Sequence, residues 1–233
     1  MPSTPLVLDP AAMTEPTRFR VRLLLEAAPS EPAPTTEGLQ LRAASALEQA
    51  ERERAIRAAW YWPEAEEVLP GLTHALEVSL ATPPEDDLEQ AVALTKAAAE
   101  LGKALGARAY LWEDTLLAHD ALAFTDQASD ASVDDLPLYL WIAFEAREDE
   151  PSKISILTRG MSSFERPEIE VDRSGRELEE ILEVVTDAAL YVLTASTALE
   201  DGETLEVTRG KVRVRTMPSL RNDGSRALRL RLP

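Results

Sequence analysis

The chain has 233 residues, of which 45% are hydrophobic and 28% are charged, a composition that is ordinary for a soluble globular protein. It contains no cysteine, which excludes disulfides and thiolate metal sites and suits a reducing cytoplasm. The formal net charge of −18 disfavours nucleic acid and anionic membranes as partners, because the long-range field repels phosphate. No secretory signal and no apolar run of transmembrane length is present, so we expect a cytoplasmic protein.

The N-terminal third predicts an arm, a strand and a helix. Residues 1–17 contain several prolines and no periodicity, which is typical of a loosely held arm. Residues 18–26 alternate apolar side chains with arginines and predict a half-buried strand. Residues 36–57 are rich in Ala, Glu, Leu and Arg with apolar residues at helical spacing, so we expect helix there.

An aromatic cluster follows in the string AWYWPEA, where Trp60, Tyr61 and Trp62 precede a proline. Two interpretations fit such a cluster. It is either a platform on which a ligand stacks or an anchor in the core at an element boundary, and the core anchor is the commoner case.

A βαβ unit is predicted next. Residues 73–80 read as a buried strand, a helix runs from Thr82 to about Leu105 and stops at Gly106, and residues 107–112 form the following strand. The two strands are expected to be parallel with a right-handed crossover. After them we expect a short helix over 116–124 and an acidic loop over 126–135.

The C-terminal half predicts a hairpin, a helix and two further strands. The hairpin strands cover 136–147 and 153–158. Residues 174–199 form the longest amphipathic helix, which opens on the capping-box pattern S-x-x-E. The last strands are expected at 205–217 and 227–232. Residues 209–233 carry +7, which leaves −25 for residues 1–208, and we expect these basic strands to pair with the acidic face of that helix rather than with nucleic acid.

The connection between the hairpin and that helix is the most distinctive stretch. Gly160 is expected to supply a permissive backbone and Phe164 to fill the core, while Pro167 opens the next strand. The G-x-S-x-G pattern of a hydrolase nucleophile is not completed, and no Asp–His pair is placed to activate a serine. Glu168 and Glu170 would share one strand face, as a solvated face or, with Asp172, as a divalent cation site; the solvated face is favoured.

The run Gly-Met-Ser-Ser-Phe-x-x-Pro-Glu-Ile-Glu resembles the signature of a bacterial family called domain of unknown function 4261, and the AWYWPEA string is similar to it as well. The resemblance extends from about residue 18 to the end and is most specific at residues 158–171. That family has no assigned chemistry, so the resemblance bears on fold and boundaries only.

Motifs for chemistry are absent from the sequence. The two histidines, His74 and His119, are not spaced as metal ligands, and no Walker loop or GxGxxG is present. We therefore predict no catalytic residues, no cofactor and no metal. The candidate interaction or structural residues are Trp60, Trp62, Gly160, Phe164, Pro167, Glu168 and Glu170.

These observations favour an α+β fold, with a mixed sheet that contains a βαβ unit and a C-terminal antiparallel region. We expect one domain over residues 18–233, with room for a division near residue 130. The leading function hypothesis is a non-catalytic acidic module that binds a basic protein, for example an immunity-type protein that neutralises a toxin or effector. One alternative is a scaffolding protein that forms a homodimer through the edge of the 227–232 strand. The other alternative is an enzyme with an unrecognised site.

Overall fold

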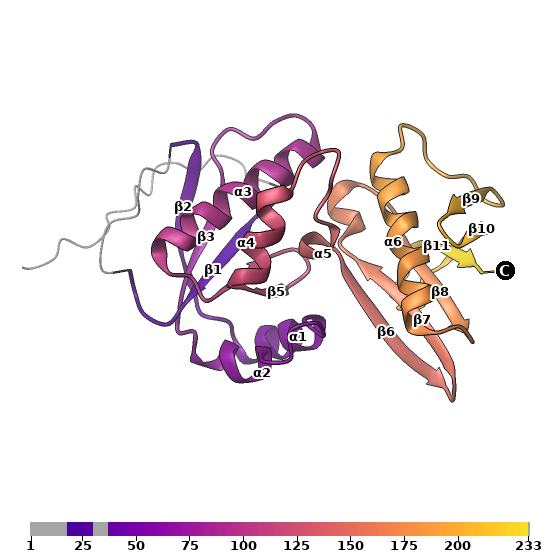
Figure 1. Ribbon diagram of the computed structural model, residues 1–233, viewed down its shortest axis with the longest axis horizontal. Coiled ribbons are helices and arrows are strands. Elements are labelled where there is room, and N and C mark those ends of the chain that lie inside the picture. Colours follow the sequence, from indigo (N-terminus) through magenta and orange to yellow (C-terminus); the bar gives the residue numbers. More distant parts are fainter. Residues whose placement is uncertain (1–17, 30–36, 233) are drawn as a thin grey trace, which may run out of the picture. The chain divides into compact units, whose positions relative to one another are not determined.

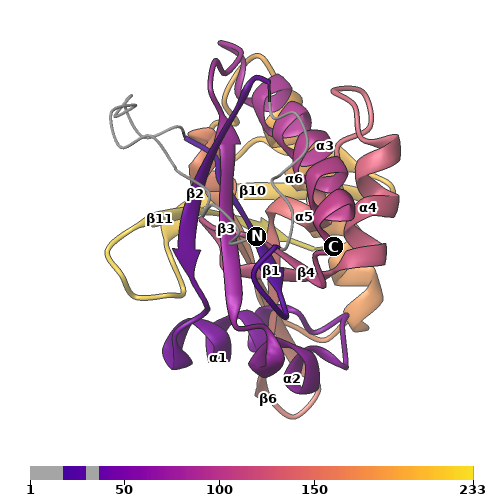
Figure 2. The ribbon, with the colours of Figure 1, turned by 90° about the vertical axis from the view of Figure 1, so that its left-hand side faces the viewer.

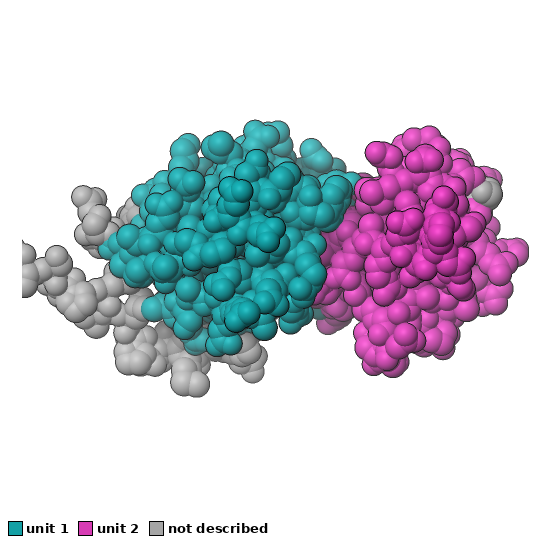
Figure 3. All heavy atoms as spheres, turned by 90° about the horizontal axis from the view of Figure 1, so that it is seen from below, with its two compact units in different colours: residues 1–140 teal, residues 141–233 magenta. Residues whose placement is uncertain are grey.

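The computed structural model describes residues 18–29 and 37–232, so the arm expected at 1–17 lies outside the described range. The chain divides into two compact units, Met1–Leu140 and Trp141–Pro233 (Figure 3). Each unit has its own sheet with helices packed on it, and the predicted α+β class is confirmed. In the described ranges, no helix is both long and apolar enough to cross a membrane.

Unit 1 is built on a five-stranded sheet with the order β2-β3-β1-β4-β5 (Figures 1 and 2). All neighbouring pairs are antiparallel. Since β3 and β4 are each antiparallel to β1, they run parallel to one another with β1 between them. The predicted βαβ unit is therefore present in split form. The strands are β1 (Val21–Leu25), β2 (Leu39–Ser45), β3 (His74–Leu80), β4 (Ala109–Trp112) and β5 (Leu117–Asp120).

Helices cover both faces of this sheet. On one face, α3 (Asp87–Leu105) packs on β1 and β3, and α4 (Ala121–Asp130) packs on β4 and β5. On the other face, apolar side chains of β1, β4 and β5 form one core cluster with the segment that contains α1 (Gln49–Ala58), α2 (Ala65–Val68) and the 3₁₀ turn η1 (Leu69–Gly71). The short α5 (Leu138–Trp141) spans the boundary between the units.

The predicted C-terminal limit of α3 is confirmed, whereas the helix begins at Asp87 and not at Thr82 as predicted. The Asp86 side chain accepts hydrogen bonds from the amides of Leu88 and Glu89, both at 2.9 Å, and so caps the N-terminus. At the other end, Gly106 adopts a left-handed conformation with φ 69°, which ends the helix as expected.

Two predictions for unit 1 are wrong. Residues 39–45 form strand β2 rather than helix, because pairing with β3 along seven residues overrides their helical composition. The short helix expected over 116–124 is β5 followed by the start of α4, and α4 continues through the first half of the expected acidic loop. Asp120 caps α4 by accepting from the amides of Leu122 and Ala123.

Unit 2 has a six-stranded sheet with the order β6-β7-β8-β11-β10-β9, and α6 (Leu178–Thr194) packs on β7, β8 and β9 (Figure 1). All pairs are antiparallel except β8 with β11, which are parallel. The predicted hairpin and the C-terminal antiparallel region are confirmed, but the first hairpin strand starts later than predicted, because Leu138–Trp141 forms α5 and β6 begins at Ala143. The strands are β6 (Ala143–Glu150), β7 (Lys153–Arg159), β8 (Glu168–Ser174), β9 (Thr204–Val207), β10 (Gly210–Pro218) and β11 (Arg226–Arg231).

Three details of unit 2 differ from expectation. The strand predicted over 205–217 is divided into β9 and β10 by a tight turn at residues 208–209. Strand β11 lies inside the sheet, between β8 and β10, so the edge proposed for dimer formation does not exist. Glu177, not Ser174, is the N-cap residue of α6; the Ser174 hydroxyl instead accepts from the Arg176 amide at 3.2 Å.

Candidate functional site

The aromatic cluster after α1 places its three rings in three different environments. Trp62 is buried in the core cluster, with 7% of its surface exposed, as an anchor would be. Tyr61 is partly buried and directs its hydroxyl inward. Trp60 is 52% exposed and meets the Tyr61 ring edge-on at 5.8 Å. The two interpretations of this cluster therefore apply to different residues. Trp62 is the core anchor, and Trp60 is the ring that is exposed as a stacking platform would be.

The Tyr61 hydroxyl is fixed by a buried histidine. His119 is fully buried on β5, with Nε2 3.2 Å from the Leu140 carbonyl and Nδ1 2.7 Å from the Tyr61 hydroxyl. A carbonyl only accepts, so Nε2 carries the hydrogen and Nδ1 is an acceptor; the single hydrogen of the Tyr61 hydroxyl is shared between Nδ1 and the Ala118 carbonyl, which lies 3.0 Å away. Burial lowers the pKa of His119 to about 3, and the imidazole is neutral at neutral pH. The imidazole is closed to solvent, and its contact with Tyr61 holds the aromatic turn on the sheet.

Acidic side chains follow Trp60 closely along the chain. Glu64, Glu66 and Glu67 are all exposed, and the chain has no Lys or Arg between Ala58 and Thr73. Successive backbone hydrogen bonds, such as Ala65 N to Trp62 O at 3.0 Å, fold this segment into compact turns. We call Trp60, Glu64, Glu66 and Glu67 the Trp60 surface. Residues 1–140 carry 10 Lys/Arg against 24 Asp/Glu, a net charge of −14.

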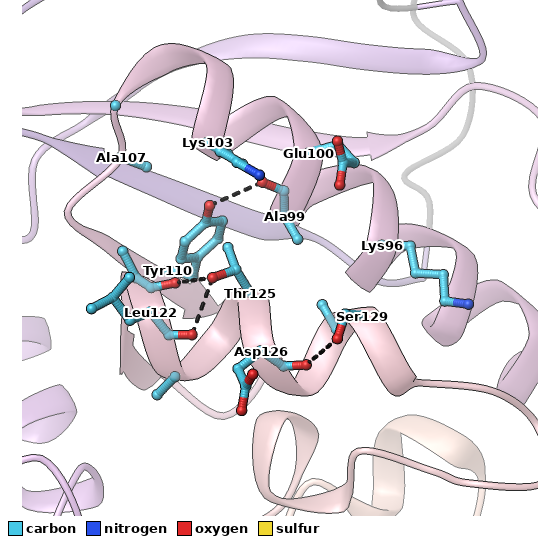
Figure 4. A pocket seen from close by; sticks show the side chains of 14 residues that line it. Lys96, Ala99, Glu100, Lys103, Ala107, Tyr110, Leu122, Thr125, Asp126 and Ser129 are labelled. Atoms are coloured by element: carbon cyan, nitrogen blue, oxygen red, sulfur yellow. Dashed lines mark hydrogen bonds between the residues drawn. The ribbon is translucent and has the colours of Figure 1, made fainter.

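A groove of about 1080 Å³ lies between α3 and α4 (Figure 4). Its floor includes Tyr110, which stacks on Phe124 at 4.2 Å and donates to the Ala99 carbonyl at 3.2 Å. The exposed Leu122 stands on one side, and the charged side chains around the groove are of mixed sign. The hydroxyls of Thr125 and Ser129 bond to carbonyls within α4. The groove thus has an apolar floor and charged walls, with its hydroxyls already engaged. The charged lining residues are Lys96, Glu100, Lys103 and Asp126.

In unit 2, Glu168 organises the loop that the sequence singled out. Its carboxylate accepts from three successive amides, of Gly160 (3.0 Å), Met161 (3.4 Å) and Ser162 (3.2 Å), and from the hydroxyls of Thr158 (2.8 Å) and Ser162 (3.2 Å). Gly160 has φ 123°, the permissive conformation predicted for it. Glu168 is therefore a loop clamp and not part of a solvated strand face.

Phe164 and Pro167 complete this loop. Phe164 is buried and packs against Trp141 at a ring distance of 5.5 Å, which confirms its predicted place in the core. Pro167 is exposed and directly precedes β8. Together with Gly160 and Glu168, these residues are brought into one loop, whereas Trp60 and Trp62 belong to unit 1.

Glu170 is also a correction to the predicted solvated face, because it is completely buried. Its carboxylate accepts from the Ser219 hydroxyl (2.6 Å), the Leu220 amide (3.0 Å) and the Arg229 guanidinium (3.0 Å). Arg221, in the same loop, donates to Glu145 at 2.7 Å. The segment between β10 and β11 is thereby folded over Glu170 and excludes water from it.

The cation site considered for Glu168, Glu170 and Asp172 does not form, since each carboxylate is committed to a different set of donors. Throughout the described part of the chain, no group of three His, Asp or Glu side chains is arranged to hold a metal. His74, at the start of β3, is exposed and bonds to the adjacent Thr73, whereas His119 is buried. The sequence contains no signal for the Tyr61–His119 pair, because the two residues are far apart along the chain.

Unit 2 is thus an α+β domain in which two glutamates of β8 hold the neighbouring loops. Residues 157–231, from β7 to the end of β11, match the model of a family described as Domain of unknown function (DUF4261). The match confirms the resemblance drawn from residues 158–171, and it does not extend to the residues before 157, where the resemblance was also expected. No curated protein and no solved structure matches the chain.

Proposed function

We propose that the protein is a non-catalytic interaction module whose Trp60 surface binds a basic segment of a partner protein. The observation that carries this proposal is the 52% exposure of Trp60 on a turn that Trp62 and Tyr61 hold rigidly in place. A large aromatic side chain left in water on a preorganised backbone is typical of an interface anchor, since little conformational entropy remains to be lost on binding.

The negative charge of unit 1 favours a basic partner. The indole face attracts Arg and Lys side chains through cation–π interaction, and the three exposed glutamates that follow Trp60 in the sequence favour the same cations. The charge of −14 on residues 1–140 would also steer a basic partner toward unit 1 and raise its association rate. An immunity-type protein that neutralises a basic toxin or effector is one form that this proposal takes.

The test begins with capture of partners from the host at low salt by the wild-type protein and by Trp60→Ala, followed by elution at high salt. We expect a basic protein that wild type retains, that Trp60→Ala loses, and that high salt releases. Tyr191→Ala is the matched control, because Tyr191 is a similarly exposed aromatic residue (44%) in unit 2. A partner that Trp60→Ala retains as well as wild type does, or that high salt does not weaken, would contradict the proposal.

A direct readout exists in the chain itself. Of the four tryptophans, Trp112 and Trp141 are fully buried and Trp62 is 7% exposed, so Trp60 is the one whose emission reports on solvent. Titration with the purified partner should shift the emission to shorter wavelength and protect it from acrylamide quenching. Trp60→Phe should abolish the change in emission and leave much of the affinity, because the aromatic face remains.

A further inference from the structure

A cleft of about 650 Å³ opens at the carboxyl ends of β8 and β11. These two strands are the parallel pair of unit 2, so their ends lie side by side and the chain leaves β8 there to enter α6. Crevices at the carboxyl ends of parallel strands are common ligand sites, and this volume suits a small molecule. The lining residues that matter for the argument are Asp172, Arg173, Arg176, Arg229 and Arg231.

The cleft is strongly basic although the chain as a whole is acidic. Four arginines line it, against one carboxylate, that of Asp172. A fifth cation is close by, because the ammonium of Lys153 lies 3.1 Å from the position that a Cβ on the lining residue Gly175 would take. Unit 2 as a whole, residues 141–233, has 14 Lys/Arg against 18 Asp/Glu, so its positive charge is locally concentrated here.

Part of this charge is neutralised within the protein. Arg229 pairs with Glu170 at 3.0 Å and with Asp172 at 3.8 Å. Arg173 pairs with Asp172 at 3.3 Å, and Arg176 pairs with Glu180 at 3.5 Å. Arg173 also pairs with Glu150 at 3.7 Å, so three of the four lining arginines have carboxylate partners.

One lining arginine, Arg231, remains uncompensated, and so does Arg213, which lies outside the lining. Arg231 stands directly opposite Arg213 in the β10–β11 ladder, so the two side chains lie on the same face of the sheet. Both are exposed, and within the part of the chain that the structure describes neither side chain has an ion pair or hydrogen bond. Like charges directly opposite one another destabilise a sheet. This cost is removed when a bound anion lies between them.

We propose that a small molecule that bears a phosphate monoester or diphosphate group binds at this cleft, held by Arg231 of its lining and by Arg213, which lies outside the lining and faces Arg231 across the β10–β11 ladder. Two uncompensated guanidinium groups match a ligand with two negative charges, and the planar fork of arginine fits phosphate oxygens in a bidentate manner. A small ligand is favoured over a nucleic acid because the cleft is local and the remainder of the chain repels a polyanion. The site lies in unit 2 and is independent of the Trp60 surface.

The test is calorimetric titration of the full chain with inorganic pyrophosphate in a low-chloride buffer. We expect saturable one-to-one binding, weakened about tenfold or more in Arg231→Ala and in Arg213→Ala. Arg54→Ala is the matched control, because it removes one exposed positive charge from α1 in unit 1, and its affinity should change less than about twofold. Failure of pyrophosphate to bind, or equal binding by all four proteins, would overturn the proposal.

A charge reversal separates the ligand site from a structural role. Arg213→Glu would place a carboxylate opposite Arg231 and should raise the melting temperature of the free protein while it abolishes pyrophosphate binding. A variant that melts at a lower temperature than wild type would contradict the repulsion on which the site rests. Two further ligands test the chemistry: citrate that binds as tightly as pyrophosphate would overturn the assignment to phosphate, and a single-stranded oligonucleotide that binds more tightly would overturn the assignment to a small molecule.

Discussion

The two units both bury ionisable groups, but they use these groups differently. In unit 1 the buried charges join strands that are already neighbours: the Arg22 guanidinium donates to both oxygens of Glu113 between the ends of β1 and β4. Burial raises the pKa of Glu113, and the hydrogen bonds from Arg22 oppose that rise. In unit 2 the carboxylates instead hold loops: Glu168 holds the loop that directly precedes β8, and Glu170 holds the loop between β10 and β11.

The difference has a consequence for stability. Unit 1 is stabilised by close apolar packing of helices on both faces of its sheet. Between α3 and β4 this packing leaves no room for another atom, because a Cβ on Gly102 would lie 2.2 Å from the Tyr110 hydroxyl oxygen. Unit 2 depends more on a few carboxylates, each of which satisfies several donors. A single polar substitution should therefore harm unit 2 most, and a single added methyl group should harm unit 1 most.

The largest effect is expected for Glu170→Ala. It leaves the Arg229 guanidinium, with a side chain only 14% exposed, and the Ser219 hydroxyl without their shared acceptor. Removing one partner of a buried pair costs about 3–5 kcal/mol, which urea denaturation followed by tryptophan emission would measure. Glu206→Ala is the control, because Glu206 is an exposed glutamate on β9, and it should change stability by no more than about 0.5 kcal/mol. Equal effects of the two changes would refute the difference drawn between the units.

The corresponding test of unit 1 is Gly102→Ala. The new methyl group would overlap the buried Tyr110 ring, whose atoms Cε1 and Cζ lie 2.6 Å from the Cβ position. Overpacking of this kind costs about 1–3 kcal/mol, measured by the same denaturation. Gly71→Ala adds the same methyl group in unit 1 with no atom within 4 Å and should be almost neutral. If Gly102→Ala is equally neutral, the contact between α3 and β4 is looser than the structure shows.

Most of the elements could be predicted from the sequence because their patterns are local. In β10, for example, Lys211, Arg213 and Arg215 alternate with Val212 and Val214, and this pattern matches the exposed and buried faces of the strand. The buried stripe of α6 is also close to the one expected, since helical spacing alone defines it. Gly106 and Gly160 were predicted correctly because the backbone conformation that favours glycine depends on their immediate neighbours.

What the sequence could not predict depends on contacts between distant segments. Alternation along β8 identifies the face of Glu170 but carries no information about the Ser219–Leu220 loop, which arrives some fifty residues later and buries that carboxylate. The helical composition of residues 39–45 is likewise overridden by pairing with β3. The predicted pairing of the basic strands with the acidic helix holds for Arg209, which meets Glu180 and Glu183, while Arg215 and Arg229 have partners elsewhere.

A smaller effect is expected for Glu168→Ala in unit 2. The carboxylate accepts five hydrogen bonds but is only partly buried, so water replaces some of them when it is removed. We expect a loss of about 2 kcal/mol in the free energy of unfolding. Hydrogen exchange should show faster exchange of the Gly160 and Ser162 amides, whereas the Leu220 amide, which bonds to Glu170, should be unchanged. Faster exchange at Leu220 as well would mean that the loops held by Glu168 and Glu170 open together.

The smallest expected effect is a pH dependence of stability that arises from His119 in unit 1. The pKa of His119 is about 3 in the folded protein, against an ordinary value of about 6.5 in the unfolded chain. Below pH 6.5 the unfolded state therefore binds a proton that the folded state does not, and stability present at neutral pH is lost as the pH falls toward 3. At about pH 5.5 the loss amounts to about 1.4 kcal/mol.

His119→Gln should remove this part of the pH dependence, measured as the difference in unfolding free energy between pH 7.5 and about pH 5.5. His74→Gln, which changes an exposed histidine at the start of β3, should retain it. If both variants retain the wild-type pH dependence, then carboxylates rather than the buried imidazole determine the acid sensitivity. The two units would then differ in their packing and not in their use of buried ionisable groups.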